Sequence, residues 1–183
     1  QAKNELSKKH FIASTIVSTP MIEKMAAAYQ VQLKKCLTGF KWIAKLIEDH
    51  PELEFIGGGE ESYGFLVGSQ VRDKDAVSAS LLMCELASEL QSQGKTVYDY
   101  LMECYSKYGI FYERLHSLTK EGKKGAQEIK AMMNQFRINP PKSIGLIPVK
   151  SVSDYLNSTR TELLSSQNHK IDLPKADVLL FHL

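Results

Sequence analysis

The stretch that decides the fold is residues 53–67, which read LEFIGGGEESYGFLV. Two short hydrophobic runs, at 53–56 and 63–67, flank the glycines and acidic residues, and this pattern predicts two strands joined by a loop. Glycines let a backbone turn sharply and lie close to a ligand. The segment therefore predicts a hairpin-like element with a glycine-rich loop at 57–64.

The acidic part of this loop has the chemistry of a polyol-binding site. Glu60 and Ser62 are two residues apart, so in an extended loop their side chains point the same way and Glu61 points the opposite way. A carboxylate accepts hydrogen bonds from sugar hydroxyls, and a serine hydroxyl donates or accepts one. The same residues also fit a plain hairpin turn with solvated acids, so the loop alone leaves both interpretations open.

The segments around this element alternate between strand and helix patterns. Strands are predicted at 11–19, 31–37 and 111–119, and helices at 21–30, 40–49, 75–91 and 97–108. Interleaved strands and helices are typical of α/β proteins. We therefore expect an α/β fold in which a mixed sheet is flanked by helices.

A change of composition follows at residues 120–125, which read KEGKKG and contain no hydrophobic side chain. We interpret this run as a hinge between a domain at 1–121 and a second, truncated α+β module at 122–183. The second module should contain one helix, at 126–136, followed by strands. Its last run, DVLLFHL at 177–183, is typical of a buried strand, and such an ending leads us to expect a chain cut from a longer protein.

Composition excludes several classes of partner. The formal net charge is only +2, which does not indicate nucleic-acid binding or attraction to a membrane surface. No hydrophobic run approaches the roughly 20 residues that a membrane span needs. The three cysteines are odd in number and widely spaced, which favours reduced thiols and a cytoplasmic location.

Two familiar motifs are incomplete. Residues 94–96 read GKT, like the end of a phosphate-binding P-loop, but Glu89 occupies the position that the motif reserves for its first glycine. The five histidines form no pair with the spacing of metal ligands. Neither a P-loop nor a histidine metal site is predicted.

Two further clusters lie at predicted turns into helices. Residues 72–75 read RDKD, and Arg72 and Lys74 precede a helix N-terminus, which itself favours anions. Residues 38–41 read TGFK and place a hydroxyl and a cation in a similar turn. Each cluster also fits a simpler interpretation, a charged loop with Asp75 as helix cap in the first case and a plain N-cap in the second.

Taken in order, four motifs resemble the third domain of the α-D-phosphohexomutases, the family of the phosphoglucomutases and phosphomannomutases. These motifs are VSTP at 17–20, TGFKWI at 38–43, GEESYG at 59–64 and RDKD at 72–75. The resemblance covers about residues 11–118. The residues after the hinge resemble the opening of the family's fourth domain, without a sharp motif.

The resemblance implies a four-domain enzyme that interconverts hexose 1-phosphate and hexose 6-phosphate through a hexose 1,6-bisphosphate. In such an enzyme a phosphoserine on the first domain is the donor, and Mg²⁺ is held by the second domain. The resemblance also implies a set of substrate-binding residues: Glu60 and Ser62 for the sugar hydroxyls, Thr38 and Gly39 for the wall of the cleft, and Lys74 and Arg72 for positive charge toward a phosphate.

The chain lacks the family's serine loop, its Asp-rich metal loop and its phosphate-gripping loop. We therefore expect no catalytic residue and no metal ligand here, and an isolated chain that is inactive. The expected partners are a phosphosugar substrate and the missing domains of the same polypeptide. Two alternatives stay open: a non-catalytic sugar- or anion-binding module on the same fold, and a helix-mediated assembly module that uses the hydrophobic stripe from Ala79 to Leu90.

Overall fold

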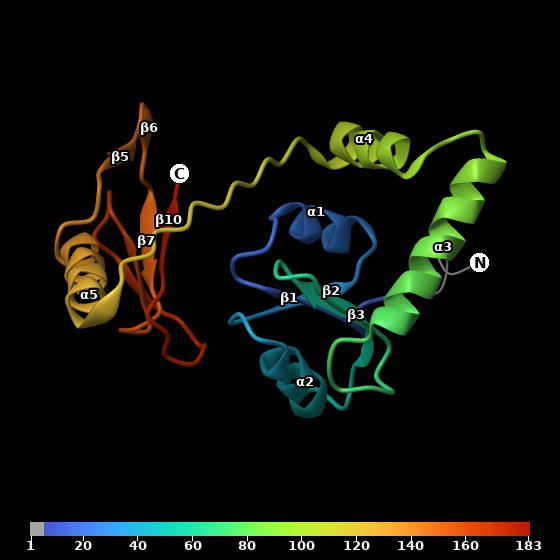
Figure 1. Cartoon of the computed structure of the whole chain (residues 1–183), viewed down its shortest axis with the longest axis horizontal. Helices are drawn as coiled ribbons and strands as arrows, with labels where there is room; N and C mark the ends of the chain where they lie inside the picture. The colour runs from blue at the N-terminus through green and yellow to red at the C-terminus, as the bar shows by residue number, and fades with distance from the viewer. Residues whose placement is uncertain (1–5) are drawn as a thin grey trace. The chain divides into compact units, whose positions relative to one another are not determined.

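The computed structural model describes residues 6–183 and divides into two units, one up to Glu113 and one from Arg114 on (Figure 1). No helix in the described residues is both long enough and apolar enough to cross a lipid bilayer. The first unit runs in the order β1 (His10–Thr15), α1 (Met21–Ala28), β2 (Gln32–Cys36), α2 (Phe40–Asp49), β3 (Glu54–Glu60), β4 (Gly64–Val67), α3 (Ala76–Ser92) and α4 (Val97–Tyr108).

The strands of the first unit form one mixed sheet in the order β2-β1-β3-β4. β1 is parallel to both β2 and β3, whereas β4 returns antiparallel to β3. Figure 1 shows α1 and α2 on opposite sides of this sheet. The predicted α/β class, with a mixed sheet flanked by helices, is confirmed.

The core of this unit lies between α2 and the sheet. Phe40, Ile43 and Ile47 recur at helical spacing along α2, and all three are buried. They pack with Phe11 of β1 and Phe55 of β3, whose ring centroids are 5.2 Å apart. Each such side chain contributes about 1.5–3 kcal/mol by leaving water. This packing fixes α2 against β1 and β3, the elements whose ends carry the candidate site.

The three glycines at 57–59 belong to β3, so the prediction of a glycine-rich loop beginning at Gly57 is wrong. Gly58 pairs with Ala13 of the neighbouring strand β1. A Cβ atom on Gly58 would lie 2.7 Å from the carbonyl oxygen of Ala13. Glycine is thus required here by close backbone approach inside a sheet, and the turn itself shrinks to residues 61–63.

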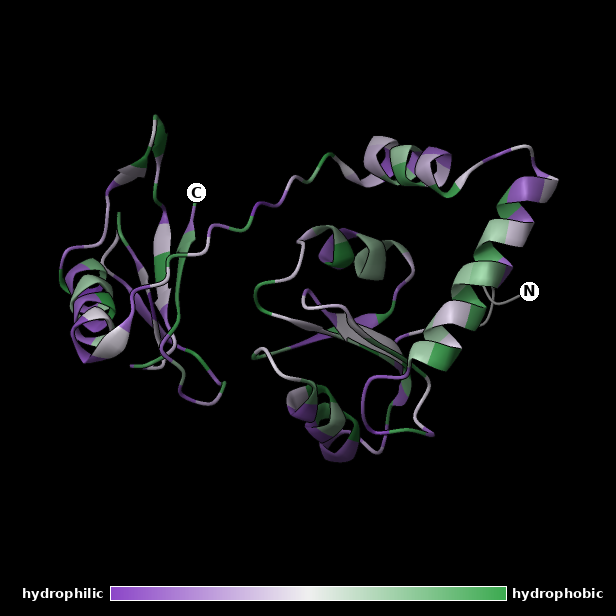
Figure 2. Ribbon diagram, in the orientation of Figure 1, coloured by the Kyte–Doolittle hydropathy of each residue, from purple (hydrophilic) through white to green (hydrophobic). Residues whose placement is uncertain are grey.

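The long helix α3 begins where the sequence predicts, because the Asp75 side chain accepts a hydrogen bond from the Val77 backbone N–H. Its hydrophobic stripe is only partly covered: Leu90 is buried, but Leu82 and Met83 are 43% and 49% exposed. Figure 2 shows hydrophobic segments, in green, along the α3 ribbon. Hydrophobic spacing therefore predicted the helix correctly but did not determine how much of it is buried.

The strand predicted at 111–119 is absent from the structure, where residues 109–121 form no helix or strand. Tyr112 and Leu115 in this segment are 86% and 87% exposed. Alternating hydrophobic residues favour an extended backbone, but a strand also needs a neighbour that supplies its hydrogen bonds. Among residues 6–183 no strand pairs with this segment.

The second unit combines one helix with antiparallel strands, which is the α+β arrangement that the sequence predicts. Its main sheet has the order β10-β7-β8-β9, and β5 and β6 form a separate hairpin. The elements are α5 (Gly122–Ile138), β5 (Ser143–Ile144), β6 (Ile147–Pro148), β7 (Ser151–Asp154), β8 (Thr159–Glu162), β9 (Asn168–Lys170) and β10 (Leu179–His182). The predicted strand at 177–183 is confirmed as β10, although it is half-buried because it lies at the edge of the sheet.

The predicted hinge at 120–125 is mostly helical, since α5 already begins at Gly122. Gly125 is buried, and a Cβ atom there would lie 2.6 Å from the carbonyl carbon of Lys120. Glycine in this run therefore serves close packing as well as flexibility. The assignment of residues 1–121 and 122–183 to a third and a fourth domain stays a prediction.

Candidate functional site

The carboxyl ends of three parallel strands meet at one edge of the first unit's sheet. β1 ends at Thr15, β2 at Cys36 and β3 at Glu60, and Thr15 pairs directly with Cys36. In open α/β sheets, ligands bind in the crevice outside the carboxyl ends of the strands. Four of the predicted site residues lie at this edge or in the segments that follow it: Thr38, Gly39, Glu60 and Lys74.

Glu60 and Gly39 are brought into direct contact. The Glu60 Oε2 atom accepts a hydrogen bond from the Gly39 backbone N–H at 3.1 Å. Gly39 is the N-cap of α2 and has φ of 116°, a value in the region that favours glycine. The end of β3 is thereby linked to the start of α2.

Glu61 is a contact residue that sequence reasoning missed. Its carboxylate accepts hydrogen bonds from the hydroxyls of Thr15 at 2.6 Å, Ser18 at 3.4 Å and Thr38 at 3.4 Å. The prediction that Glu61 points away from the site assumed an extended loop, but residues 61–63 form a turn in which Tyr63 has φ of 66°. A signal that could have found this cluster is the set of hydroxyl residues at the end of β1 and in the segments that follow β1 and β2.

Lys74 and Glu60 both approach Gly64. A Cβ atom on Gly64 would lie 2.9 Å from Glu60 Oε1 and 3.0 Å from Lys74 Cδ, so both side chains pass close to this glycine. The Lys74 ammonium lies 2.7 Å from Asp73 Oδ1 and 5.3 Å from the centre of the Phe40 ring. Its pKa is raised, first by the hydrogen bond to Asp73 and then by the negative charges of Asp73 and Glu60.

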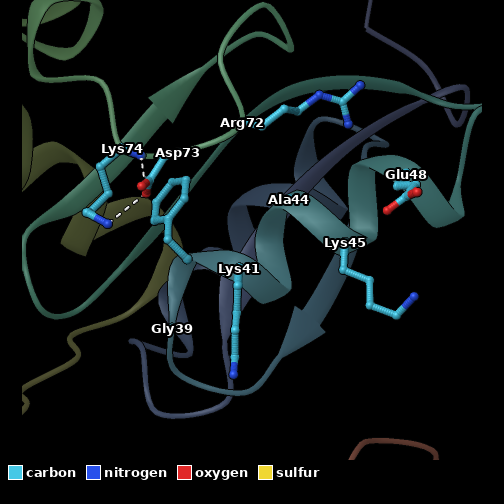
Figure 3. A pocket seen from close by; sticks show the side chains of 9 residues that line it. Gly39, Lys41, Ala44, Lys45, Glu48, Arg72, Asp73 and Lys74 are labelled. Atoms are coloured by element: carbon cyan, nitrogen blue, oxygen red, sulfur yellow. Dashed lines mark hydrogen bonds and ion pairs between the residues drawn. The ribbon is translucent and has the colours of Figure 1, made fainter.

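Lys74 and Arg72 also line a groove of about 800 Å³ along α2 (Figure 3). Figure 3 shows that α2 supplies further cations, Lys41 and Lys45, to the same region. Lys45 is paired with Asp49 at 2.9 Å. The groove is lined by Gly39, Phe40, Lys41, Ala44, Lys45, Glu48, Arg72, Asp73 and Lys74. Four cations and two carboxylates in this set leave it positive, which suits an anionic ligand.

Ser62 occupies a different position from the other predicted residues. It lies exposed in the turn between β3 and β4. Within residues 6–183 the structure gives its hydroxyl no hydrogen-bond partner. The structure therefore places Ser62 at the rim of the strand-end edge, with its hydroxyl open to solvent.

The described residues do not fit a magnesium site. Residues 6–183 contain no group of three His, Cys, Asp or Glu side chains placed to hold a metal ion. The two neighbouring carboxylates, Glu60 and Glu61, accept from a backbone N–H and from three hydroxyls.

Cys36, at the end of β2, should make the first unit less stable as the pH becomes alkaline. Burial, followed by the negative charges of Glu60 and Glu61, raises the pKa of its thiol from 9.0 to about 11. The unfolded chain therefore ionises this thiol first as pH rises. We expect the free energy of unfolding to fall between about pH 9 and 11, with Cys36 contributing at most about 1.4 kcal/mol per pH unit.

The measurement is urea unfolding at pH 8, 9 and 10, followed by the fluorescence of Trp42, the single tryptophan, which packs against the core. Lysines and tyrosines also titrate in this range, so a Cys36→Ala variant serves as the control. Its unfolding free energy should depend less steeply on pH. Equal slopes in the two proteins would contradict the role assigned to the thiol.

Comparison with known proteins gives consistent matches. A family model described as phosphoglucomutase/phosphomannomutase, alpha/beta/alpha domain III, matches residues 1–108. The chain is 40% identical over 182 residues to a phosphoglucomutase of Staphylococcus aureus (strain MRSA252), covering 98% of this chain and 32% of that protein. A phosphoglucomutase of Staphylococcus epidermidis is 39% identical over 166 residues, covering 90% of this chain and 30% of that protein.

One solved structure supports the fold. It is the open form of the exocytosis-sensitive phosphoprotein pp63/parafusin, a phosphoglucomutase, from Paramecium. The TM-score is 0.52 at 19% identity, and the match covers 87% of this chain and 27% of that one. The chain thus spans about a third of the length of the curated relatives that it matches.

Proposed function

The chain belongs to the phosphoglucomutase/phosphomannomutase family, and we propose that it is the part of such an enzyme that recognises the sugar hydroxyls of the substrate. The complete enzyme interconverts hexose 1-phosphate and hexose 6-phosphate. In this proposal Glu60 and Ser62 bind hydroxyls, Thr38 and Gly39 form the wall of the cleft, and Lys74, with Arg72 near it, attracts a phosphate.

The observation that carries the proposal is the meeting of separate segments at the carboxyl ends of the parallel strands. The Glu60 carboxylate accepts a hydrogen bond from the Gly39 N–H at 3.1 Å. The Lys74 side chain passes close to the same carboxylate beside Gly64. A carboxylate, hydroxyls and a cation at one edge are the groups that a phosphorylated polyol needs. The positive groove lined by Arg72 adds attraction for the phosphate.

The chemistry of the reaction agrees with this role. A bisphosphorylated intermediate must turn over so that either phosphate can face the donor group. A loop that binds the ring in both orientations needs acceptors that tolerate exchanged hydroxyls, and a carboxylate with a serine hydroxyl meets that need. Catalysis is then mostly positioning and stabilisation of charge.

We assign the chemical step to parts of the enzyme beyond this chain, which spans about a third of its curated relatives. These parts would supply the phosphoserine, the Mg²⁺ site and the grip on the second phosphate, and a hexose 1,6-bisphosphate would be the intermediate. We place the enzyme in the cytoplasm, because Cys36, Cys84 and Cys104 are free thiols, as is usual in reducing compartments.

The test compares the isolated chain with the full-length polypeptide that contains it. Both are supplied with glucose 1-phosphate, Mg²⁺ and a trace of glucose 1,6-bisphosphate, and formation of glucose 6-phosphate is followed by a coupled dehydrogenase. We expect turnover by the full-length protein and none by the isolated chain above a protein-free background.

Turnover by the isolated chain would contradict the assignment of the chemistry to other domains. A full-length protein that binds glucose 1-phosphate in a calorimeter but never converts it would support the alternative, a non-catalytic sugar- or anion-binding module. Mannose 1-phosphate, tested in parallel with isomerases added that convert mannose 6-phosphate into glucose 6-phosphate, identifies the preferred sugar.

A further inference from the structure

We propose that Glu61 is a positioning residue, which ties together three segments at the carboxyl ends of the strands so that Glu60, Thr38 and Gly39 face the substrate. The proposal rests on the function proposed above for Glu60. The two neighbours have different roles in this proposal. Glu60 binds the sugar, and Glu61 holds the protein segments around Glu60 in place.

The contacts of Glu61 reach two other segments, which with its own turn makes three. Thr15 ends β1, Ser18 lies in the connection to α1, and Thr38 lies between β2 and α2. Thr15 and Ser18 both donate to Oε2, at 2.6 and 3.4 Å, whereas Thr38 donates to Oε1 at 3.4 Å. One carboxylate thus uses both oxygens to connect residues that are far apart in the sequence.

Counting protons shows that an acceptor at position 61 is needed if both hydroxyls are to donate. Thr15 and Ser18 also lie 2.9 Å from each other, but each hydroxyl has only one proton to donate. If Thr15 donates to Glu61, Ser18 remains free to donate to Thr15 or to Glu61. Thr15 is only 1% exposed and has little access to water, so without Glu61 its remaining acceptor is Ser18, whose own proton then has no acceptor in this cluster.

The two adjacent carboxylates act on the same short segment. Glu61 accepts from the Thr38 hydroxyl, and Glu60 accepts from the Gly39 N–H directly after it. The segment between β2 and α2 is therefore held from two sides. Loss of the Glu61 contacts should let this segment and the turn at 61–63 move, which displaces Glu60 from its place beside Gly39.

The experiment measures kcat and KM of the full-length enzyme with Glu61→Ala, Glu61→Gln, Thr15→Val and the Glu61→Ala/Thr15→Val double variant. Glu61→Ala should lower kcat/KM about 10- to 100-fold, since misplaced binding groups have losses of this order. The loss should fall mainly on KM, because the loop binds hydroxyls in the ground state and the transition state alike. A merely unfolded fraction would instead lower kcat at constant KM.

Glu61→Gln should stay within about threefold of the original kcat/KM, because its amide oxygen still accepts from hydroxyls and a hydroxyl accepts from its amide N–H. The double variant should lose no more than Glu61→Ala alone, as expected for residues in one network. Glu85→Gln, an exposed carboxylate on α3, is the control and should leave both constants unchanged. Equal losses for Glu61→Gln and Glu61→Ala would overturn the proposal, since the charge itself would then be required.

A second readout on the 183-residue chain separates this proposal from the function proposed above. Hydrogen exchange of the Gly39 amide should become about tenfold faster in Glu61→Ala and stay unchanged in Glu61→Gln. Unchanged exchange in Glu61→Ala would overturn the positioning role even if the enzyme is a mutase. Absence of turnover in the unaltered full-length protein would refute the mutase function but leave the exchange result valid.

Discussion

Glu60→Gln in the full-length enzyme is expected to lower kcat/KM about 10- to 150-fold, which corresponds to about 1.5–3 kcal/mol, the range for a charge-assisted hydrogen bond. The substitution keeps the shape of the side chain, and its amide oxygen still accepts from the Gly39 N–H. It removes the negative charge that sugar hydroxyls would meet. The measurement is the steady-state rate with glucose 1-phosphate as the varied substrate.

The local structure provides a check on this interpretation. Because Glu60 is one cause of the raised pKa of Lys74, the variant should also lower that pKa toward its ordinary value. Glu85→Gln, on the exposed surface of α3, makes the same chemical change away from the site and should leave kcat/KM unaltered. Kinetics of Glu60→Gln within twofold of the original protein would mean that the assignment of Glu60 is wrong.

Gly58→Ala is expected to lower the free energy of unfolding of the first unit by about 3 kcal/mol, the upper end of the usual cost of overpacking. The added methyl group would lie 2.7 Å from the Ala13 carbonyl oxygen and 3.1 Å from the Ala13 Cβ. The obstacle is backbone of β1 in the middle of the sheet, which cannot rotate away as a side chain tip can. Urea unfolding followed by Trp42 fluorescence measures the change, since this single tryptophan packs against the core of the unit.

A second glycine supplies the matched control. Gly68 has φ of 68°, and a Cβ atom there would meet nothing within 4 Å. Asparagine tolerates this backbone conformation better than most residues, so Gly68→Asn should change the unfolding free energy by less than about 1 kcal/mol. A Gly58→Ala protein as stable as Gly68→Asn would show that β1 and β3 can separate at small cost.

Much of the first unit could be predicted from local pattern. Hydrophobic spacing along α2 predicted Phe40, Ile43 and Ile47 as one face, and the structure buries all three. Asp75 was predicted as the cap of α3, and its side chain accepts from the Val77 N–H. Caps and helical faces depend on residues close together in the chain, so sequence contains the whole of that information.

The two wrong predictions of secondary structure share a cause that is not local. The glycines at 57–59 were predicted as loop, but the close approach of Ala13 places them in β3. The alternating run at 111–119 was predicted as a strand, but no neighbour in the described part of the chain pairs with it. In both cases the outcome depends on whether a distant segment lies alongside, and local pattern does not contain that information.

The candidate site shows the same difference between what local pattern predicts and what distant contacts decide. The sequence by itself determined which chemical groups are available: a carboxylate pair at 60–61, a hydroxyl and a glycine at 38–39, and cations at Arg72 and Lys74. Only the tertiary structure decided which contacts each of these groups makes. Parallel pairing brings the ends of β1, β2 and β3 to one edge, so that Glu60 reaches the Gly39 N–H and Glu61 turns inward to the three hydroxyls. Composition and spacing determine the available chemistry, whereas contacts between distant segments depend on how the strands pair.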